Sequence, residues 1–145
     1  MPSDIHKDFL PAAIGLIREI RKRFNLRAAA LDMTYARAQA LVAIAGNEGM
    51  TQAELAKHLD IRTPSMTRTL DHLEEQGLIE RRAVAGDKRV RSLYLTDIAH
   101  AQADKVVGFT EELRRELYRD IDPGDLENAL TVIKQLQRNL ERVRD

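Results

Sequence analysis

The spacing of apolar residues changes twice along the chain and so predicts three segments of two kinds. Before residue 77, apolar residues recur every three to four positions, as on the buried side of amphipathic helices. Around residues 78–95 they fall in two short runs, one of which alternates with polar residues, as in a β-hairpin. Helical spacing then returns and continues almost to the C-terminus. The pattern predicts an α+β protein that is mostly α, with one hairpin between helical segments.

A pair of short helices is predicted directly before the hairpin. Thr51 and Glu54 have the spacing of a capping box, in which each side chain accepts from a backbone N–H at a helix start. The pattern breaks at residues 60–62 and resumes at Thr63 and Pro64, where Thr can cap a helix and Pro suits its first position. We therefore predict a helix-turn-helix whose second helix covers residues 63–76. Its inward side chains are Met66, Leu70 and Leu73.

Basic residues are concentrated on the predicted hairpin at residues 78–95, whose turn falls at residues 85–87. They are Arg81, Arg82, Lys88, Arg89 and Arg91. Asp87 is the one acidic residue between Arg81 and Arg91. A charge run is usually a solvated surface, but this one directly follows a helix with small polar side chains on its outer face. The arrangement is that of a winged helix-turn-helix lobe, here residues 34–96, and it favours contact with nucleic acid.

The same stretch resembles the MarR (multiple antibiotic resistance regulator) family. The residues that carry the resemblance are GLIERR at 77–82, DKR at 87–89 and LYLT at 93–96. The segment PSMTRTLDHLEEQGLI at 64–79 resembles the recognition helix of the SlyA-like branch. The likeness covers nearly the whole chain, residues 1–145, as a single MarR-type domain. It implies a two-fold dimer joined by its N- and C-terminal helices, here residues 1–30 and 97–145.

The long terminal helices carry apolar stripes of their own. In the first helix, Ile14, Ile17, Ile20 and Phe24 are expected to face inward, and Pro11 marks either a kink or a displaced start. The last helix has a heptad seam, with Asp122 and Pro123 opening it. The seam consists of Leu126, Ala129, Ile133, Leu136, Leu140 and Val143. It packs either on its own domain or on a second copy. Because a small winged domain leaves a terminal seam little to bury against, we favour a homodimer interface formed by Leu126, Ile133, Leu136, Leu140 and Val143.

A dimer of this kind presents two recognition helices to successive major grooves of double-stranded DNA, so its operator should be pseudo-palindromic. Ser65, Thr67 and Arg68 are the candidates for the groove, where Arg can pair with guanine. Arg62 and Thr63 suit phosphates at the helix N-terminus. Arg89 suits a narrow minor groove, with Lys88 and Arg91 as further DNA contacts. Asp87 is expected to position either Arg89 or Arg81, so Asp87 and Arg81 are predicted to support the wing.

Composition narrows the possible functions. The net charge is zero, but residues 61–96 carry 7 Lys or Arg against 5 Asp or Glu, and residues 97–145 carry 8 against 11. The basic excess thus lies with the DNA-binding motif. The chain has no Cys, which excludes disulfides and a cysteine redox switch. Without an apolar run that spans a bilayer or a secretory signal, it is expected in the cytoplasm.

The resemblance implies that small anionic aromatic compounds bind between the dimer helices and the DNA-binding lobe. Arg37 can hold the carboxylate of such an effector, with Tyr35 and Ala38 nearby; alternatively, Arg37 pairs with a neighbouring Asp or Glu. The 4 His residues show no metal spacing, and no catalytic motif or cofactor site is evident. We therefore expect a non-enzymatic regulator, most simply a repressor released by a ligand. The alternatives are an activator or counter-silencer with the same fold, and a winged-helix module for protein assembly.

Overall fold

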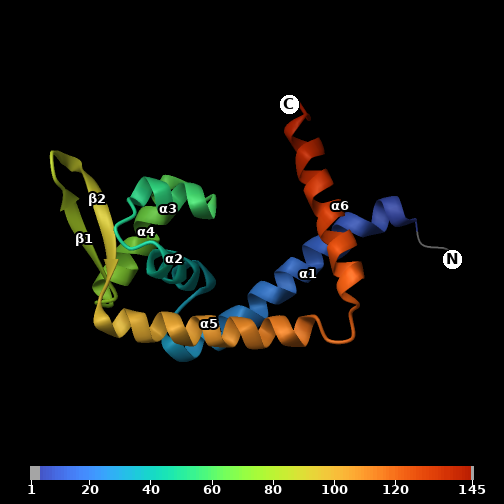
Figure 1. The fold of residues 1–145 in the computed structure, drawn as a ribbon, viewed down its shortest axis with the longest axis horizontal. Coiled ribbons are helices and arrows are strands. Elements are labelled where there is room, and N and C mark those ends of the chain that lie inside the picture. The colour runs from blue at the N-terminus through green and yellow to red at the C-terminus, as the bar shows by residue number, and fades with distance from the viewer. Residues whose placement is uncertain (1–3, 145) are drawn as a thin grey trace. The chain divides into compact units, whose positions relative to one another are not determined.

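The computed structural model describes residues 4–144. Within that range the chain forms six α-helices, one short 3-10 helix and one two-stranded antiparallel sheet (Figure 1). In chain order they are α1 (Ile5–Ala28), η1 (Ala29–Leu31), α2 (Tyr35–Gly46), α3 (Gln52–Leu59), α4 (Thr63–Glu75), β1 (Ile79–Val84), β2 (Asp87–Leu95), α5 (Asp97–Leu117) and α6 (Pro123–Glu141). The prediction of a mostly helical α+β fold is confirmed. None of the helices in this range is long and apolar enough to cross a membrane.

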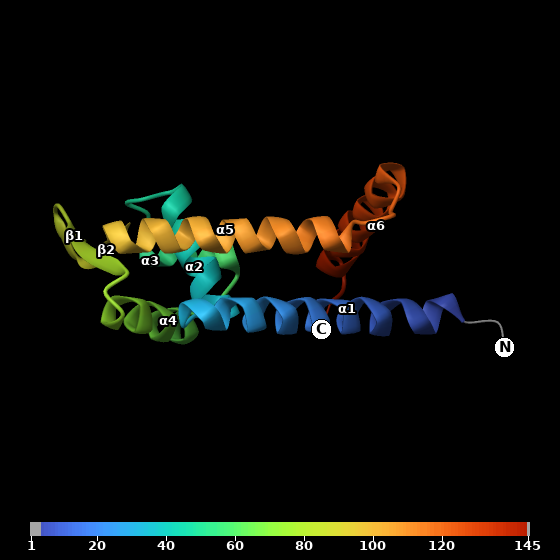
Figure 2. The ribbon, with the colours of Figure 1, turned by 90° about the horizontal axis from the view of Figure 1, so that it is seen from below.

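The chain divides into two compact units, Met1–Glu111 and Glu112–Asp145, so α5 contributes to both. In the first unit, α2, α3, α4 and the hairpin gather at the C-terminal end of α1 (Figure 2). Phe24 of α1 joins this lobe to the first part of α5, because its ring packs edge-on against Phe109 with centroids 5.0 Å apart. Edge-on aromatic pairs of this kind add to the stabilisation that burial alone provides.

Local caps explain where most of the helices begin. Thr34 Oγ1 accepts from the amide of Arg37 at 3.3 Å, which starts α2. The predicted capping box of α3 is present, with Thr51 and Glu54 each accepting from the other's amide. Asp122 Oδ1 accepts from the amide of Gly124 at 2.7 Å and starts α6. Each cap satisfies N–H groups that have no partner inside the helix.

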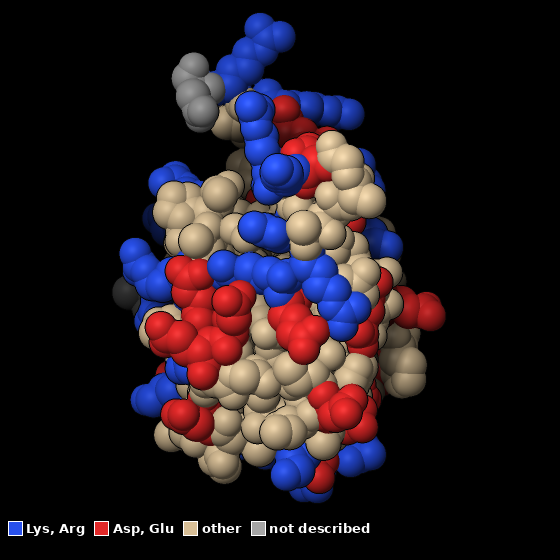
Figure 3. Space-filling view, turned by 90° about the vertical axis from the view of Figure 1, so that its left-hand side faces the viewer, with Lys and Arg blue, Asp and Glu red and all other residues tan. Residues whose placement is uncertain are grey.

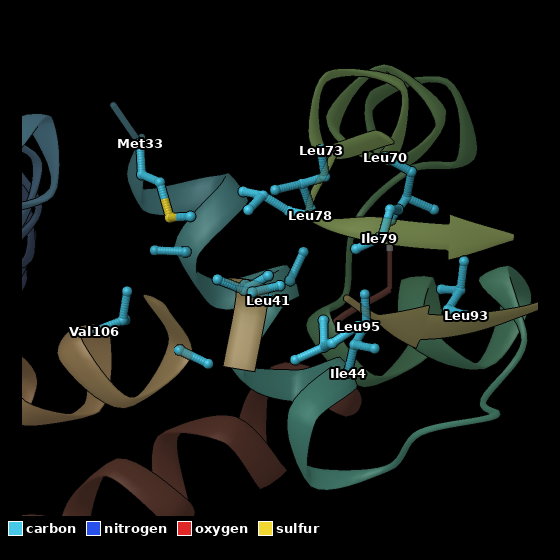
Figure 4. Close-up of a cluster of buried hydrophobic side chains, with 14 of the residues drawn as sticks. Met33, Leu41, Ile44, Leu70, Leu73, Leu78, Ile79, Leu93, Leu95 and Val106 are labelled. Carbon is cyan, nitrogen blue, oxygen red and sulfur yellow. The ribbon is translucent and has the colours of Figure 1, made fainter. Parts of the chain in front are cut away.

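The core of the first unit is apolar and draws on every element of the lobe (Figure 4). Its largest fully buried side chains are Leu41, Ile44, Leu55, Met66, Leu70, Leu73 and Leu93. Figure 4 shows side chains of α2 and α4 meeting those of β1 and β2, so the recognition helix and the hairpin rest on one continuous core. Among the described residues, no polar or charged side chain is buried.

The hairpin has a regular base and an irregular tip. Its register pairs Ile79 with Leu95 at the base, and the last regular pair is Ala83 with Arg91. The next pair is Val84 with Asp87, so residues 88–90 form a bulge on β2. A third segment joins the sheet, because the amide of Gly49 donates to Leu93 O and the amide of Leu93 donates to Met50 O, both at 2.8 Å. The base is thereby fixed to the loop before α3, whereas the tip extends beyond it.

The first helix differs from the prediction in its outward half. Helix α1 starts at Ile5, where Asp4 caps it, and continues through Pro11. Phe24 is buried as expected, but Ile14 and Ile17, predicted to face inward, are 59% and 52% exposed. Periodicity identified the apolar side of α1 correctly. The N-terminal half of the helix, however, extends beyond the lobe that buries Phe24. Within the described chain, these side chains therefore lack an apolar covering.

The seam of α6 is also open to solvent within the chain. Ile133 is 49% exposed, Leu136 is 39% exposed, and Leu140 is 70% exposed, whereas Leu126 is only partly exposed. Val143 lies outside the helix, because α6 ends at Glu141 and Arg142 is its C-cap. Five of the six predicted seam residues therefore lie in the helix, and Val143 does not.

Candidate nucleic-acid interface

Helix α4 presents a polar surface because its other side is held in the core. Met66, Leu70 and Leu73 are completely buried, one turn apart along the inner side of the helix. Ser65 and Arg68 are exposed on the outer side. Two of the three residues predicted for groove contact are therefore accessible from solvent. The third, Thr67, is half-buried, and its Oγ1 accepts from Gln52 Nε2 of α3 at 2.8 Å.

The start of α4 differs from the predicted cap. The N-cap is Arg62, with no side-chain hydrogen bond to the helix, and Thr63 is already the first helical residue, so the prediction that Thr63 caps the helix is wrong. Thr63, Arg62 and Pro64 are all exposed. Because no side chain caps the first turn, its N–H groups remain available to donate hydrogen bonds to an anion. The expected phosphate contacts at Arg62 and Thr63 keep their geometric basis.

Arg81 fastens the hairpin to α4. One of its terminal nitrogens (Nη2) lies 2.7 Å from Asp71 Oδ1, and its Nε lies 3.4 Å from Glu74 Oε2. The Arg81 side chain is only 21% exposed, whereas its partners Asp71 and Glu74 are 56% and 52% exposed. Of the two partners predicted for Asp87, Arg81 is not in contact with it. Arg81 instead links the wing to the recognition helix.

The tip of the hairpin exposes basic side chains at a defined position. Gly86 has φ of +86°, a conformation that suits glycine in the tight turn, and Asp87 Oδ1 accepts from the amide of Arg89 at 2.9 Å. Asp87 therefore fixes the backbone of Arg89. Lys88, Arg89 and Arg91 are exposed, and none of them forms an ion pair with any residue in the described range. Figure 3, a view of the side of the molecule that carries the hairpin, shows Lys and Arg side chains there together with Asp and Glu side chains.

Arg82 contrasts with these residues. Its guanidinium lies 3.9 Å from the centroid of the Tyr94 ring, and its Nη2 donates to Glu80 Oε2 at 3.0 Å. Both interactions occupy it within the hairpin. The exposed basic side chains of the hairpin that form no ion pair in the described range, Lys88, Arg89 and Arg91, thus all belong to β2.

A cleft of about 470 Å³ separates the hairpin from the two helices of the motif. Thr51 and Gln52 line it from the start of α3, Thr63 and Met66 from α4, and Arg89 and Arg91 from β2. Hydroxyl, amide and guanidinium groups therefore meet in one hollow between the recognition helix and the wing. We call it the α3–α4–wing cleft.

The three residues predicted for an effector pocket lie in different surroundings. Ala38 is completely buried in the core and offers no surface to a ligand. Tyr35 packs edge-on against Phe24, with ring centroids 5.0 Å apart, and Gln39 donates to its hydroxyl. Arg37 is half-buried, and its Nε donates to Thr34 Oγ1 at 3.4 Å. No carboxylate of the described residues lies within ion-pair distance of Arg37, so the alternative of a neighbouring acidic partner is not observed.

Sequence reasoning missed Gln52, Asp71 and Glu74. A helical-wheel projection places Thr67, Asp71 and Glu74 on one flank of α4, which is a signal that this flank faces other protein elements. Among the described residues, no group of three or more side chains is arranged to hold a metal ion.

These elements define a winged helix-turn-helix protein whose recognition helix and wing expose polar and basic side chains. A model of the MarR family matches residues 31–90. The chain is 29% identical to the transcriptional regulator PA3341, with 93% of this chain and 99% of that chain covered and a TM-score of 0.81. It is 25% identical to a mutant MarR from E. coli complexed with operator DNA, with 92% and 99% covered and a TM-score of 0.78. These matches support the MarR family for this chain.

The transcriptional regulator SlyA has the same fold, with 20% identity, 97% of this chain and 96% of that chain covered, and a TM-score of 0.81. At that identity the likeness concerns the fold alone. The SlyA-like branch therefore stays a prediction from the residues of the recognition helix.

Proposed function

We propose that this chain is a sequence-specific, double-stranded DNA-binding transcription regulator of the MarR family, acting as a homodimeric repressor. The observation that carries the proposal is the position of Arg68, which is exposed on the outer side of α4 while the inner side of that helix is buried in the core. Beside it, the wing exposes Lys88, Arg89 and Arg91, which form no ion pair within the described range. Such a surface matches the needs of groove reading by a helix and backbone or minor-groove contact by a hairpin. Its relatives in complex with operator DNA support the same use of the fold. We accordingly propose that it acts in the cytoplasm.

Exposed apolar side chains on the terminal helices support the homodimer. Both α1 and α6 expose a stripe of large apolar residues, among them Ile14, Ile17, Ile133 and Leu140. Exposed stripes of this length are unusual on a monomeric protein and are typical of interfaces. Two copies joined through these helices would set a fixed distance between the two α4 helices. The operator is accordingly a pseudo-palindrome with half-sites about one helical turn apart.

The proposal predicts specific duplex binding that depends on Arg68. A duplex selected by the wild-type protein from random sequence should bind in a gel shift more tightly than a scrambled duplex, and its affinity should fall steeply with salt. Arg68→Ala should lower the affinity for the selected duplex by roughly 10-fold to 100-fold and relax the base preference at one position of each half-site. Repeating the selection with the variant measures that relaxation directly.

A protein-assembly module would show no duplex affinity at any salt concentration, and that outcome would refute the proposed function. Lys57→Ala is a matched control, because Lys57 is an exposed basic residue of α3 outside the proposed interface. It should leave the selected sequence unchanged. A loss of affinity without relaxed preference in Arg68→Ala would move Arg68 from base reading to phosphate contact.

We further propose that an aromatic carboxylate releases the repressor by binding at Arg37. The support is a half-buried guanidinium that no acidic side chain of the described residues neutralises. A screen of aromatic acids should contain compounds that raise the melting temperature of the wild type but not of Arg37→Ala, and these compounds should weaken duplex binding. Equal stabilisation of both proteins by every hit would place the effector site elsewhere.

A further inference from the structure

A hydrogen bond at the edge of the α3–α4–wing cleft orients one hydroxyl of the recognition helix. Gln52 lines the cleft from α3, and its Nε2 donates to Thr67 Oγ1 at 2.8 Å. Both side chains are half-buried. A hydroxyl carries one hydrogen and two acceptor positions. Because the amide occupies an acceptor position, the hydroxyl hydrogen of Thr67 remains available to a second partner.

Thr67 lies next to the cleft without lining it, since its hydrogen-bond partner Gln52 is part of the cleft wall. Thr63 lies one helical turn before it, on the same flank, and is part of the cleft wall. Arg68 and Ser65, in contrast, project from the outer side of the helix. The hydroxyl of Thr67 therefore belongs to the flank between the recognition helix and the wing, away from the residues best placed for base edges.

The cleft has apolar walls from Ala53, Ala56, Met66 and Val90, and the polar groups set among them can donate hydrogen bonds. The wing contributes the guanidinium groups of Arg89 and Arg91, and the helices contribute the hydroxyls of Thr51 and Thr63. Phosphate oxygens only accept hydrogen bonds, whereas base edges present both donors and acceptors. When a helix occupies one groove and a hairpin the next, the sugar–phosphate strand that separates the grooves passes between them. The cleft has the position and the chemistry for that strand.

We propose that Gln52 is a positioning residue that aims the Thr67 hydroxyl at a backbone phosphate seated in the α3–α4–wing cleft. The proposal rests on the proposed DNA-binding function and deepens it. It assigns Thr67 to phosphate contact, one of the two roles that its hydroxyl chemistry allows. It also gives Gln52 a role in affinity without any role in base preference.

A double-mutant cycle tests this coupling, with the duplex selected by the wild type as the probe. Thr67→Val removes the hydroxyl at nearly constant volume and should weaken binding by roughly 10-fold, as expected for a hydrogen bond to a charged acceptor. Gln52→Ala should weaken binding by about 5-fold, since the hydroxyl is kept but no longer oriented. The double variant should bind no more weakly than Thr67→Val, because Gln52 acts through Thr67. Selection from random sequence should return the wild-type sequence for all three variants.

The control is Gln39→Ala, which also removes a half-buried glutamine that donates to a hydroxyl, but in α2 and outside the cleft. It should leave duplex affinity unchanged, and all variants should be compared by thermal melting. If Gln52→Ala still weakens binding in the Thr67→Val background, the positioning role is overturned. If Thr67→Val alters the selected sequence, Thr67 contacts a base and the phosphate assignment is overturned. If the wild type selects no duplex, the proposed function itself fails.

Discussion

Ile133→Asp should convert the proposed dimer into monomers and lower affinity for the operator by about 100-fold or more, because a single recognition helix then binds each half-site alone. An ionised carboxylate cannot remain desolvated in an apolar interface without a partner, so the second copy would be excluded. Ile133 is 49% exposed within its own chain, and α6 places no buried residue in the core. The helical content of the protomer should therefore survive. Sedimentation velocity and circular dichroism, together with the gel shift, measure the three expectations.

Thr131→Asp is the matched control for this substitution. It adds the same charge to the same helix two residues earlier, on the opposite side of α6, where the Thr131 hydroxyl only donates to Glu127 O at 3.0 Å. This variant should stay dimeric and bind the operator normally. A dimeric Ile133→Asp protein with full operator affinity would exclude the α6 seam from the interface. Dissociation of both variants would show that added charge, rather than the seam, is responsible.

Helix starts could be predicted from sequence because a cap is a local interaction. Thr51 and Asp122 form the expected side-chain bonds, to amides three and two residues later, and Thr34 forms a bond of the same kind to the amide of Arg37. Thr96 does so too, accepting from Ala99 while its hydroxyl also donates to Gly77 O at 2.8 Å. Thr63 is the exception: α4 begins there as predicted, but Arg62 rather than Thr63 is the N-cap. Boundaries of this kind commonly differ by a residue because neighbouring starts have similar energies.

The supports of the candidate site depend on tertiary contacts that periodicity does not encode. Arg81 reaches Asp71 only because the hairpin packs on α4 in one register, and Gln52 reaches Thr67 only because α3 crosses α4 at that point. Likewise, the spacing of Ile14 and Ile17 indicated an apolar side of α1 but not what covers it. Sequence pattern thus predicted which side of each element is apolar or basic. Which element packs against each side can be identified only from the assembled fold. For α1 and α6 we propose that the packing partner is the second copy of the chain.

Arg89→Ala should lower operator affinity by about 10-fold to 100-fold. It should also reduce the slope of log affinity against log salt concentration by about one. The wing tip carries Arg89 on a bulge whose backbone Asp87 fixes at 2.9 Å, so the guanidinium extends from an anchored position. A narrow, A·T-rich minor groove concentrates negative potential and attracts such a side chain. The variant should therefore also lose any preference for A·T pairs beside the half-sites. Titration of the duplex at several salt concentrations measures the affinity and the slope together.

Arg82→Ala separates the position of the charge from the charge itself. It removes one guanidinium from the same hairpin, but one already held by Glu80 at 3.0 Å and by the ring of Tyr94. If the wing acted only through net charge, both substitutions would change affinity and salt slope equally, because long-range attraction depends weakly on position. A direct contact at Arg89 requires a clear difference between them. Equal effects would leave the wing as a diffuse electrostatic surface, and the bulge at residues 88–90 would then have no role in placing an arginine in the groove.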